Sequence, residues 1–265
     1  MKLLIQRIKY YLGIWTLLVK MSLKRSRLYK TEIYSRVFRA LMLVAIQALV
    51  VESLFVHTDA VVGWSRPEYY LLVGSYNLVN YMGWAIFNVN LRRLQEKIIK
   101  GELDYPLLKP SGALFELAFG EFFIDDLVPI ISGVILVLIY LLTQPISGIA
   151  AIILYFLALL FGLLIWFAIY LLFASLGLLF LGGNFSDIIK SFGSSASAPA
   201  KIWGRYEMIF YTLLPVGLVA SVPAELLRGS LGGGFLLINA VVAITFTFLV
   251  LRFWNFALRK YESGG

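Results

Sequence analysis

The sequence has little of what most enzyme sites require. Cysteine is absent and His57 is the single histidine, so disulfides and cysteine metal sites are excluded and little imidazole chemistry is available. No set of serine, histidine and carboxylate residues makes a credible hydrolytic site, and we expect neither a catalytic nor a metal site. The first thirty residues are interrupted by lysines and arginines and lack the apolar core of a cleavable signal peptide.

Charge is also scarce, whereas apolar surface is abundant. Only 14% of the 265 residues are charged, 60% are hydrophobic, and the mean hydropathy is +0.86. A soluble domain of this length could not bury that much apolar surface. The strands of a membrane barrel alternate polar and apolar residues, whereas residues 149–181 are apolar on every face. The sequence therefore predicts an all-α membrane protein.

The chain divides into an amphipathic amino-terminal segment and a transmembrane domain. Residues 1–30 place apolar side chains at spacings of three and four between basic ones, which predicts a helix lying along the membrane surface. Residues 31–265 form the predicted transmembrane domain. Its six predicted spans are 33–55, 69–90, 122–142, 149–181, 208–222 and 235–253.

The basic residues predict the orientation of these spans. With six spans, 21 of the 23 lysines and arginines fall on one side. By the positive-inside rule that side is the cytoplasm, so both termini, the loop 92–113 and the serine-rich loop 182–206 are expected there. The net charge of +8 then reflects topology, and we expect no nucleic-acid partner.

The loop between the second and third spans, IIKGELDYPLLKPSG at 98–112, combines apolar and charged residues. Gly101 is expected to end a short helix, after which Pro106 and Pro110 fix an extended exit. The loop is either an ordinary connection or a surface on which another protein docks. The candidate docking residues are Gly101, Glu102, Leu103, Asp104, Leu107, Leu108 and Pro110.

Polar residues within the spans are the second group of candidates. Asn77, Tyr81, Trp84 and Asn88 lie close to one face of the second span, which should turn inward because unpaired amides are costly in hydrocarbon. They either bond neighbouring helices to one another or line a translocation path.

Acidic residues accompany the third predicted span. Glu121 and Asp125 lie four residues apart, with Asp126 beside them. They are buried in the membrane if the span begins near residue 114, where they could bind a cation, and lie at the inner boundary if it begins near 127. Arg36 or Arg39 could pair with them in either case.

Short motifs in this order resemble a known family. Lys100-Gly101-Glu102-Leu103-Asp104, followed by Leu107-Leu108-Lys109-Pro110, resembles the G-x-L-D and L-x-x-P signature of permease subunits of type-2 ABC exporters. The ending Tyr261-Glu262-Ser263 also resembles that of the family, and the resemblance covers the whole chain.

The resemblance implies a half-transporter in the plasma (inner) membrane of a bacterium. It would pair with a second permease chain, as a homodimer or paralogous heterodimer, and with two copies of a separate ABC ATPase that dock on the coupling loop 92–113. The chain itself has no G-x-x-x-x-G-K-[ST] phosphate loop. ATP and Mg are therefore expected on the partner, and no cofactor on this non-enzymatic chain.

Three expectations stay open from the sequence. The resemblance suggests that the segment 215–234 re-enters the outer leaflet, although it could be a plain surface loop. The transported substrate is undetermined. Two other functions fit the residues: a secondary transporter driven by ions through Glu121 and Asp125, and a noncatalytic membrane scaffold that also contacts lipid.

Overall fold

The chain folds almost entirely into helices. The computed structural model describes residues 2–28, 30–146, 148–180, 188, 193 and 195–261. Within these ranges the one sheet is a small antiparallel hairpin of β1 (Ala60–Val61) and β2 (Trp64–Ser65). The predicted all-α class is confirmed.

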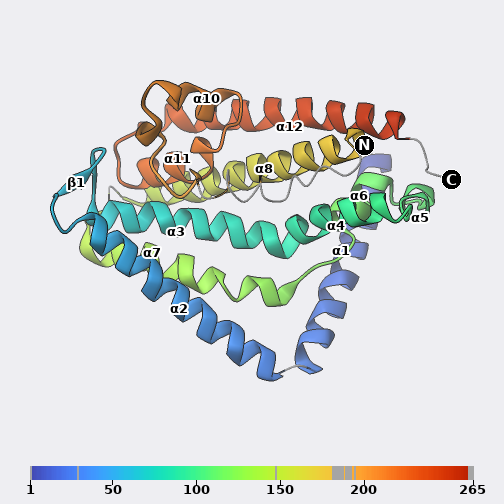
Figure 1. The fold of residues 1–265 in the computed structure, drawn as a ribbon, viewed down its shortest axis with the longest axis horizontal. Helices are drawn as coiled ribbons and strands as arrows, with labels where there is room; N and C mark the ends of the chain where they lie inside the picture. The colour runs from blue at the N-terminus through green and yellow to red at the C-terminus, as the bar shows by residue number, and fades with distance from the viewer. Residues whose placement is uncertain are drawn as a thin grey trace.

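The long helices run side by side between two ends of the molecule (Figure 1). We call the end with the hairpin the outer end and the opposite end the inner end. The helices that run lengthwise are α3 (Arg66–Gly83), α7 (Ile130–Thr143), α8 (Ile149–Leu179) and α12 (Gly234–Lys260), and α2 (Lys30–Leu54) runs obliquely away from them. Three short helices gather at the inner end: α4 (Val89–Ile99), α5 (Asp104–Leu108) and α6 (Ala113–Phe119).

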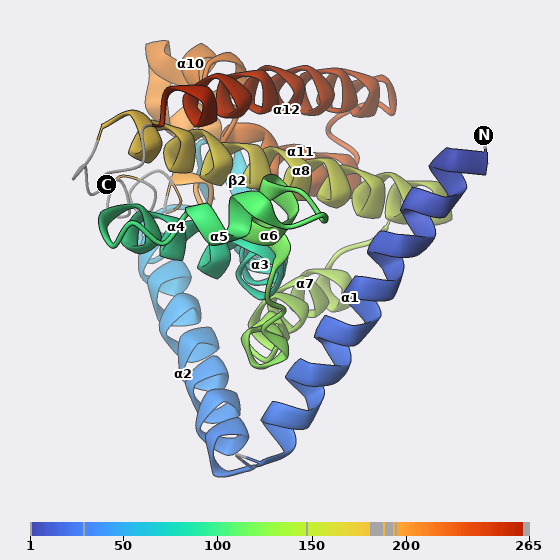
Figure 2. The ribbon, with the colours of Figure 1, turned by 90° about the vertical axis from the view of Figure 1, so that its right-hand side faces the viewer.

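Helix α1 (Lys2–Leu28) runs in a different direction from the bundle. It crosses the inner end and meets α2 at a sharp bend (Figure 2). The end of α12 also lies at the inner end (Figure 1). The motif residues Glu262 and Ser263 lie outside the described residues.

Among the described residues, four helices are long and apolar enough to cross a membrane. They are Tyr34–Leu54, Ile124–Thr143, Ile149–Leu179 and Gly234–Lys260. They coincide with the first, third, fourth and sixth predicted spans. The third includes η2 (Ile124–Leu127), a short 3-10 helix that precedes α7. The multi-pass membrane architecture is thus confirmed, whereas the full count of six spans is not.

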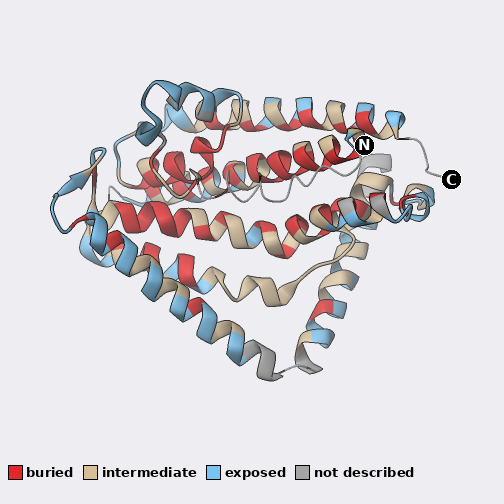
Figure 3. Ribbon diagram, in the orientation of Figure 1, coloured by how far each residue is buried: buried red, intermediate tan, exposed pale blue. Residues whose placement is uncertain are grey.

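The second predicted span is helical but too polar to belong to that group of four. Helix α3, the π-helix η1 (Trp84–Asn88) and α4 continue one another along the chain. Helix α3 packs against α7 and α8, so most of its side chains are buried (Figure 3). Because protein rather than lipid surrounds this helix, its surface does not need to be strongly apolar.

The fifth predicted span, 208–222, is wrong as a continuous helix. The chain forms α10 (Glu207–Thr212), turns at 213–216, and forms α11 (Gly217–Leu227). Pro215 lies in the turn and has no N–H to continue the helix. The eleven residues of α11 span about 17 Å, little more than half a bilayer core.

Eleven of the 25 residues in the predicted cytoplasmic loop 182–206 lie outside the described ranges. Two described parts of this loop do not lie where a cytoplasmic loop was expected. Gly193 lies against the side chains of Trp166 and Tyr76 in the bundle. The 3-10 helix η3 (Ala200–Tyr206) and α10 lie beside the outer half of α12 (Figure 1), which differs from the inner position that the basic residues predicted.

Glycines allow the closest helix contacts. A Cβ atom on Gly74 of α3 would lie 3.0 Å from the carbonyl oxygen of Gly133 on α7, and one on Gly133 would lie 2.9 Å from that of Gly74. A Cβ atom on Gly162 of α8 would lie 2.5 Å from the carbonyl oxygen of Val219 in α11. Small residues let helix backbones approach in this way within membranes.

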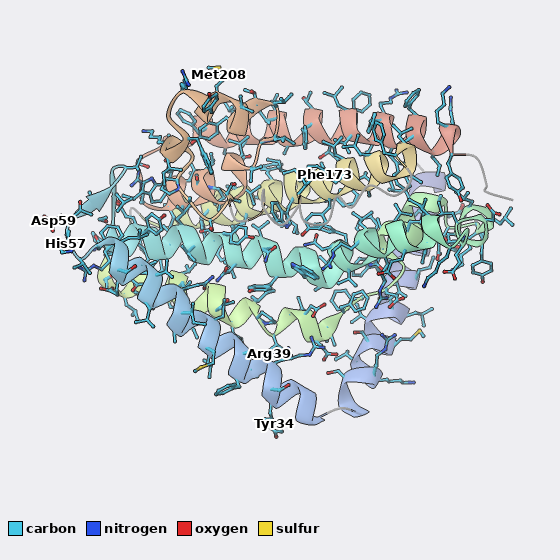
Figure 4. All side chains as sticks on the ribbon, in the orientation of Figure 1. Tyr34, Arg39, His57, Asp59, Phe173 and Met208 are labelled. Atoms are coloured by element: carbon cyan, nitrogen blue, oxygen red, sulfur yellow. The ribbon has the colours of Figure 1, made fainter. Side chains whose placement is uncertain are left out.

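One arginine fastens the outer end. The guanidinium of Arg228, which follows α11, lies 3.1 Å from the carboxylate of Glu68 in α3 and 4.1 Å from the ring centroid of Trp64 in β2. It also donates to the carbonyl of Gly63. The side chain of Arg228 is 14% exposed, so α11, the hairpin and α3 meet at a largely buried charge. His57 is exposed and lies at the tip of the hairpin region with Asp59 (Figure 4).

Candidate functional site

The loop at the inner end begins with a regular helix stop. Helix α4 ends where the N–H of Glu102 donates to the carbonyl of Lys97 at 2.8 Å and the N–H of Gly101 donates to that of Ile98 at 3.1 Å. This pair of bonds is the Schellman motif, in which the first of the two donor residues along the chain adopts the left-handed conformation. Gly101 has φ +68° and supplies it. The predicted helix end at Gly101 is therefore confirmed, and the chain turns directly into α5.

Leu103 is part of the hydrophobic core and is not exposed at the surface of the loop. Its side chain is 0% exposed and belongs to the buried cluster that includes Leu94, Ile98 and Leu117. The prediction that Leu103 lies on the docking surface is wrong for this reason. Its apolar side chain lies in one buried cluster with residues of α4 and α6, and Pro106 is buried as well.

The outer face of α5 exposes two large apolar residues that are three positions apart. Tyr105 is 72% exposed and Leu108 is 84% exposed. Their spacing places them on one side of the helix. We call the exposed residues of this loop the α5 surface; they are Glu102, Asp104, Tyr105, Leu108 and Pro110. Leu107 is half-buried and Gly101 is exposed but shapes the turn.

Sequence reasoning missed Tyr105. It stands between residues that the family motif marks, and the motif itself does not include it. The signal that could have found it is the spacing of Tyr105 and Leu108, because residues three apart share a helix face and Leu103 occupies a different one.

A polar clamp holds the exit of the loop. The ammonium of Lys109 lies 2.6 Å from the carboxylate of Glu116 in α6, and the hydroxyl of Ser111 donates to the same carboxylate. The hydrogen bond with Glu116 raises the pKa of Lys109. Burial alone would raise the pKa of Glu116, but the hydrogen bonds from Lys109 and Ser111, with the charges of Lys109 and Lys97, outweigh burial and lower it.

Helix α1 lies directly behind this loop. The hydroxyl of Tyr11 donates to the carbonyl of Ser111 at 3.0 Å, and its ring lies 4.9 Å from that of Phe115. Further along α1, the hydroxyl of Ser22 accepts the N–H of Ile124 at 2.9 Å. Helix α1 therefore links the loop to the start of the third span.

Asn77 has partners on two neighbouring helices. Its amide nitrogen donates to Gln47 of α2 at 2.8 Å and to the hydroxyl of Ser132 of α7 at 3.1 Å. Gln47 donates back to Asn77 at 3.2 Å. These bonds account for a buried asparagine through helix packing alone.

Asn88 differs, because both atoms of its side-chain amide are buried without a hydrogen-bond partner among the described residues. It ends the π-helix η1. A Cβ atom on Gly83 would lie 3.2 Å from the amide oxygen of Asn88 and 2.9 Å from the indole ring of Trp166. The indole nitrogen of Trp166 also lacks a described partner. Two orphaned polar groups therefore share one region of the core beside a π-helix, a combination that is typical of functional or moving parts.

Tyr81 and Trp84 lie between Asn77 and Asn88 along the continuous helix of α3 and η1. Tyr81 lines a cavity of about 330 Å³ between α2, α3 and η2. The guanidinium of Arg92 lies 5.1 Å from the ring centroid of Trp84. Four residues that share a helix face in the sequence thus have four different surroundings.

The three acidic residues are paired with separate partners. Glu121 lies 3.0 Å from Arg93 and 3.9 Å from Arg25, whereas Asp125 accepts a hydrogen bond from Ser26 at 2.6 Å. Asp126 lies 3.0 Å from Arg36, so the expected pairing with that arginine is confirmed for Asp126. The helix α7 begins only at Ile130, and the described residues contain no cluster of ligands that could hold a metal ion.

Comparison with known proteins defines the class. The model of the family described as "ABC-2 family transporter protein" matches residues 41–265, which is most of the chain, and the chain belongs to this family. The curated proteins and the solved structures contain no match. The chain is thus a membrane permease component of an ABC transporter, the class that its motifs resemble.

Proposed function

We propose that this chain is the permease subunit of an ATP-driven exporter in a bacterial inner membrane, with both termini in the cytoplasm. Two permease chains, identical or paralogous, form the translocation path. Two ATPase chains bind ATP and Mg and dock at the inner end. The single observation that carries the proposal is the α5 surface, where Tyr105 and Leu108 are 72% and 84% exposed although Leu103 and Pro106 of the same loop are buried.

The chemistry of this surface fits a protein partner. Exposed aromatic and aliphatic side chains side by side supply the buried centre of an interface. The carboxylates of Glu102 and Asp104 lie at its rim and select a partner with basic groups there. The surface lies at the end of the molecule that the basic residues assign to the cytoplasm, where ATPase subunits are found.

Force from the ATPase has a direct route into the bundle. Leu103 lies in the same buried cluster as Leu94 and Ile98 of α4, and α4 continues through η1 into α3. A displacement of α5 therefore moves a helix that contacts α7, α8 and α11. ATP can shift the equilibrium only toward a state that it binds more tightly. Tighter binding of ATP to the closed pair of ATPases therefore supplies the free energy for this movement. Asn88 and Trp166 lie at the π-helix, where a change of helix register would expose or pair them.

The outer segment 215–234 closes the path from outside. Buried α11 enters the bundle beside α8, and the chain returns to the outer end at Arg228. This arrangement suits a segment that re-enters the outer leaflet, since protein covers its irregular turn.

The docking surface can be tested with one double variant. The change Tyr105→Ala with Leu108→Ala removes both apolar side chains without touching Leu103. Each centre residue of an interface is worth more than about 1 kcal/mol, so we expect at least about 30-fold weaker ATPase binding and a matching loss of vanadate-sensitive ATP hydrolysis in vesicles. The matched control is Tyr206→Ala with Leu213→Ala, which removes an exposed tyrosine and leucine near the outer end.

Two results would overturn the proposal. One is a double variant that binds its ATPase as strongly as the unmodified chain. The other is purification in mild detergent without any bound ATPase, combined with transport driven by an ion gradient alone. That second result, with loss of transport in Asp125→Asn, would indicate an ion-coupled carrier, and absence of all transport would indicate a scaffold.

A further inference from the structure

A cavity near the bend between α1 and α2 carries more positive than negative charge. It has a volume of about 330 Å³ and is lined by Arg36, Arg39, Ala40, Leu43, Tyr81, Asp126 and Pro129. Arg39 is on the inner part of α2 in Figure 4. Two guanidinium groups face one carboxylate, so the lining has one positive charge in excess.

The two arginines have different surroundings. Arg36 is bound to Asp126 at 3.0 Å, and both side chains are about three-quarters buried. Arg39 is exposed and has no ion pair or hydrogen bond among the described residues. The ion pair fixes one guanidinium in the wall of the cavity, and the excess charge resides on Arg39. Guanidinium groups bind phosphate oxygens through two parallel N–H donors.

The cavity is continuous with an apolar helix face. Phe38 and Met42, which lie on either side of Arg39 along α2, are 61% and 44% exposed. Only 11% of the apolar stretch of this helix is buried. A ligand whose anionic group enters the cavity therefore meets hydrocarbon immediately beside it. This combination of one excess cation and an adjoining apolar face fits an amphiphile with one phosphodiester.

We infer that this cavity binds the phosphodiester headgroup of an acidic phospholipid from the inner leaflet, with Arg39 and Arg36 holding the phosphate and the acyl chains lying along α2. The volume corresponds to roughly ten water molecules, and a phosphoglycerol headgroup has about as many non-hydrogen atoms. The phenol of Tyr81 is available as a further donor at the wall. The site is separate from the α5 surface and requires no ATPase.

Binding can be measured on the full-length chain in detergent by native mass spectrometry with added phosphatidylglycerol. Arg39→Gln removes the excess charge and leaves the pair of Arg36 and Asp126 intact. Because Arg39→Gln loses charge-assisted hydrogen bonds to the phosphate, we expect this variant to bind phosphatidylglycerol at least about tenfold more weakly. The control, Arg252→Gln, removes an exposed arginine of α12 that does not line the cavity, and we expect unchanged binding.

A second variant keeps the test decisive if Arg39→Gln does not fold. Arg36→Gln with Asp126→Asn removes both members of the ion pair, so the lining keeps its excess charge on Arg39 but loses one of the two guanidinium groups that hold the phosphate, and we expect weaker phosphatidylglycerol binding than in the unmodified chain. Folding is checked for each variant by its elution volume.

Three results would refute the inference. Soluble glycerol phosphate that displaces the lipid at equal concentration would assign the cavity to a free phosphate compound. Equal binding of zwitterionic phosphatidylcholine would show that the net negative charge of the lipid has no role in binding. An equal loss in Arg252→Gln would show general attraction to the basic surface of the chain.

Discussion

Truncation of Leu103 tests whether this residue supports the loop or contacts a partner. Leu103→Ala removes three buried carbon atoms, which costs about 2.4 kcal/mol in transfer free energy, and the cavity left behind adds to this. Because Leu103 is 0% exposed in a cluster with Leu94, Ile98 and Leu117, we expect a total of about 3 kcal/mol. The loop would then open about a hundredfold more often.

Hydrogen–deuterium exchange of the detergent-solubilised chain measures this opening directly. We expect faster exchange of the amides between residues 94 and 117 in Leu103→Ala, with unchanged exchange in α7 and α12. Leu108→Ala is the matched control, because its side chain is 84% exposed and its truncation removes little buried area. It should exchange as the unmodified chain does.

The opposite pattern would refute the assignment. If Leu103→Ala exchanged normally but lost its ATPase, Leu103 would contact the partner itself and the packing of α5 on α4 and α6 would be incidental.

Three further changes test other contacts. Arg228→Gln should lower the free energy of unfolding by about 3 kcal/mol, because it strands a partly buried carboxylate, and Arg66→Gln at a half-exposed pair should cost less than about 1 kcal/mol; thermal unfolding compares them. Gly162→Ala should cost about 1–3 kcal/mol, whereas Gly232→Ala, with open space around it, should not destabilise the chain in the same melts. The clamp should weaken on acidification: Glu116 has a lowered pKa when folded, so its contribution is complete above its unfolded pKa of about 4.3 and is lost as pH falls. Exchange at 109–116, corrected for intrinsic rates, should show this loss, and Glu116→Gln should abolish the pH dependence.

The class of the protein and four of its membrane-spanning helices could be predicted because they depend on composition and length alone. Residues 149–181 are apolar on every face and exceed the roughly 20 residues that a helix needs to cross a bilayer core. The stop at Gly101 was predictable for a local reason: a Schellman turn requires a left-handed residue, and glycine adopts that conformation without strain.

The remaining spans were less predictable because their surroundings decide their composition. Helix α3 has protein on most sides, so lipid does not select its residues, and Asn77 can be satisfied by Gln47 and Ser132. The segment 208–222 is apolar enough to suggest a span, but Pro215 divides it and α11 is buried by contact with α8. Hydropathy reports that a residue is apolar and does not report whether lipid or protein covers it.

The sequence by itself determined the membrane class, the family motif and the position of the loop at 98–112. Only the tertiary structure decided which of its residues face outward. Leu103 and Leu108 are the same residue type in one short segment, yet one is 0% and the other 84% exposed. The physical reason is that burial depends on how the neighbouring helices pack: Leu103 lies in a buried cluster with Leu94 of α4 and Leu117 of α6, whereas Leu108 lies outside it.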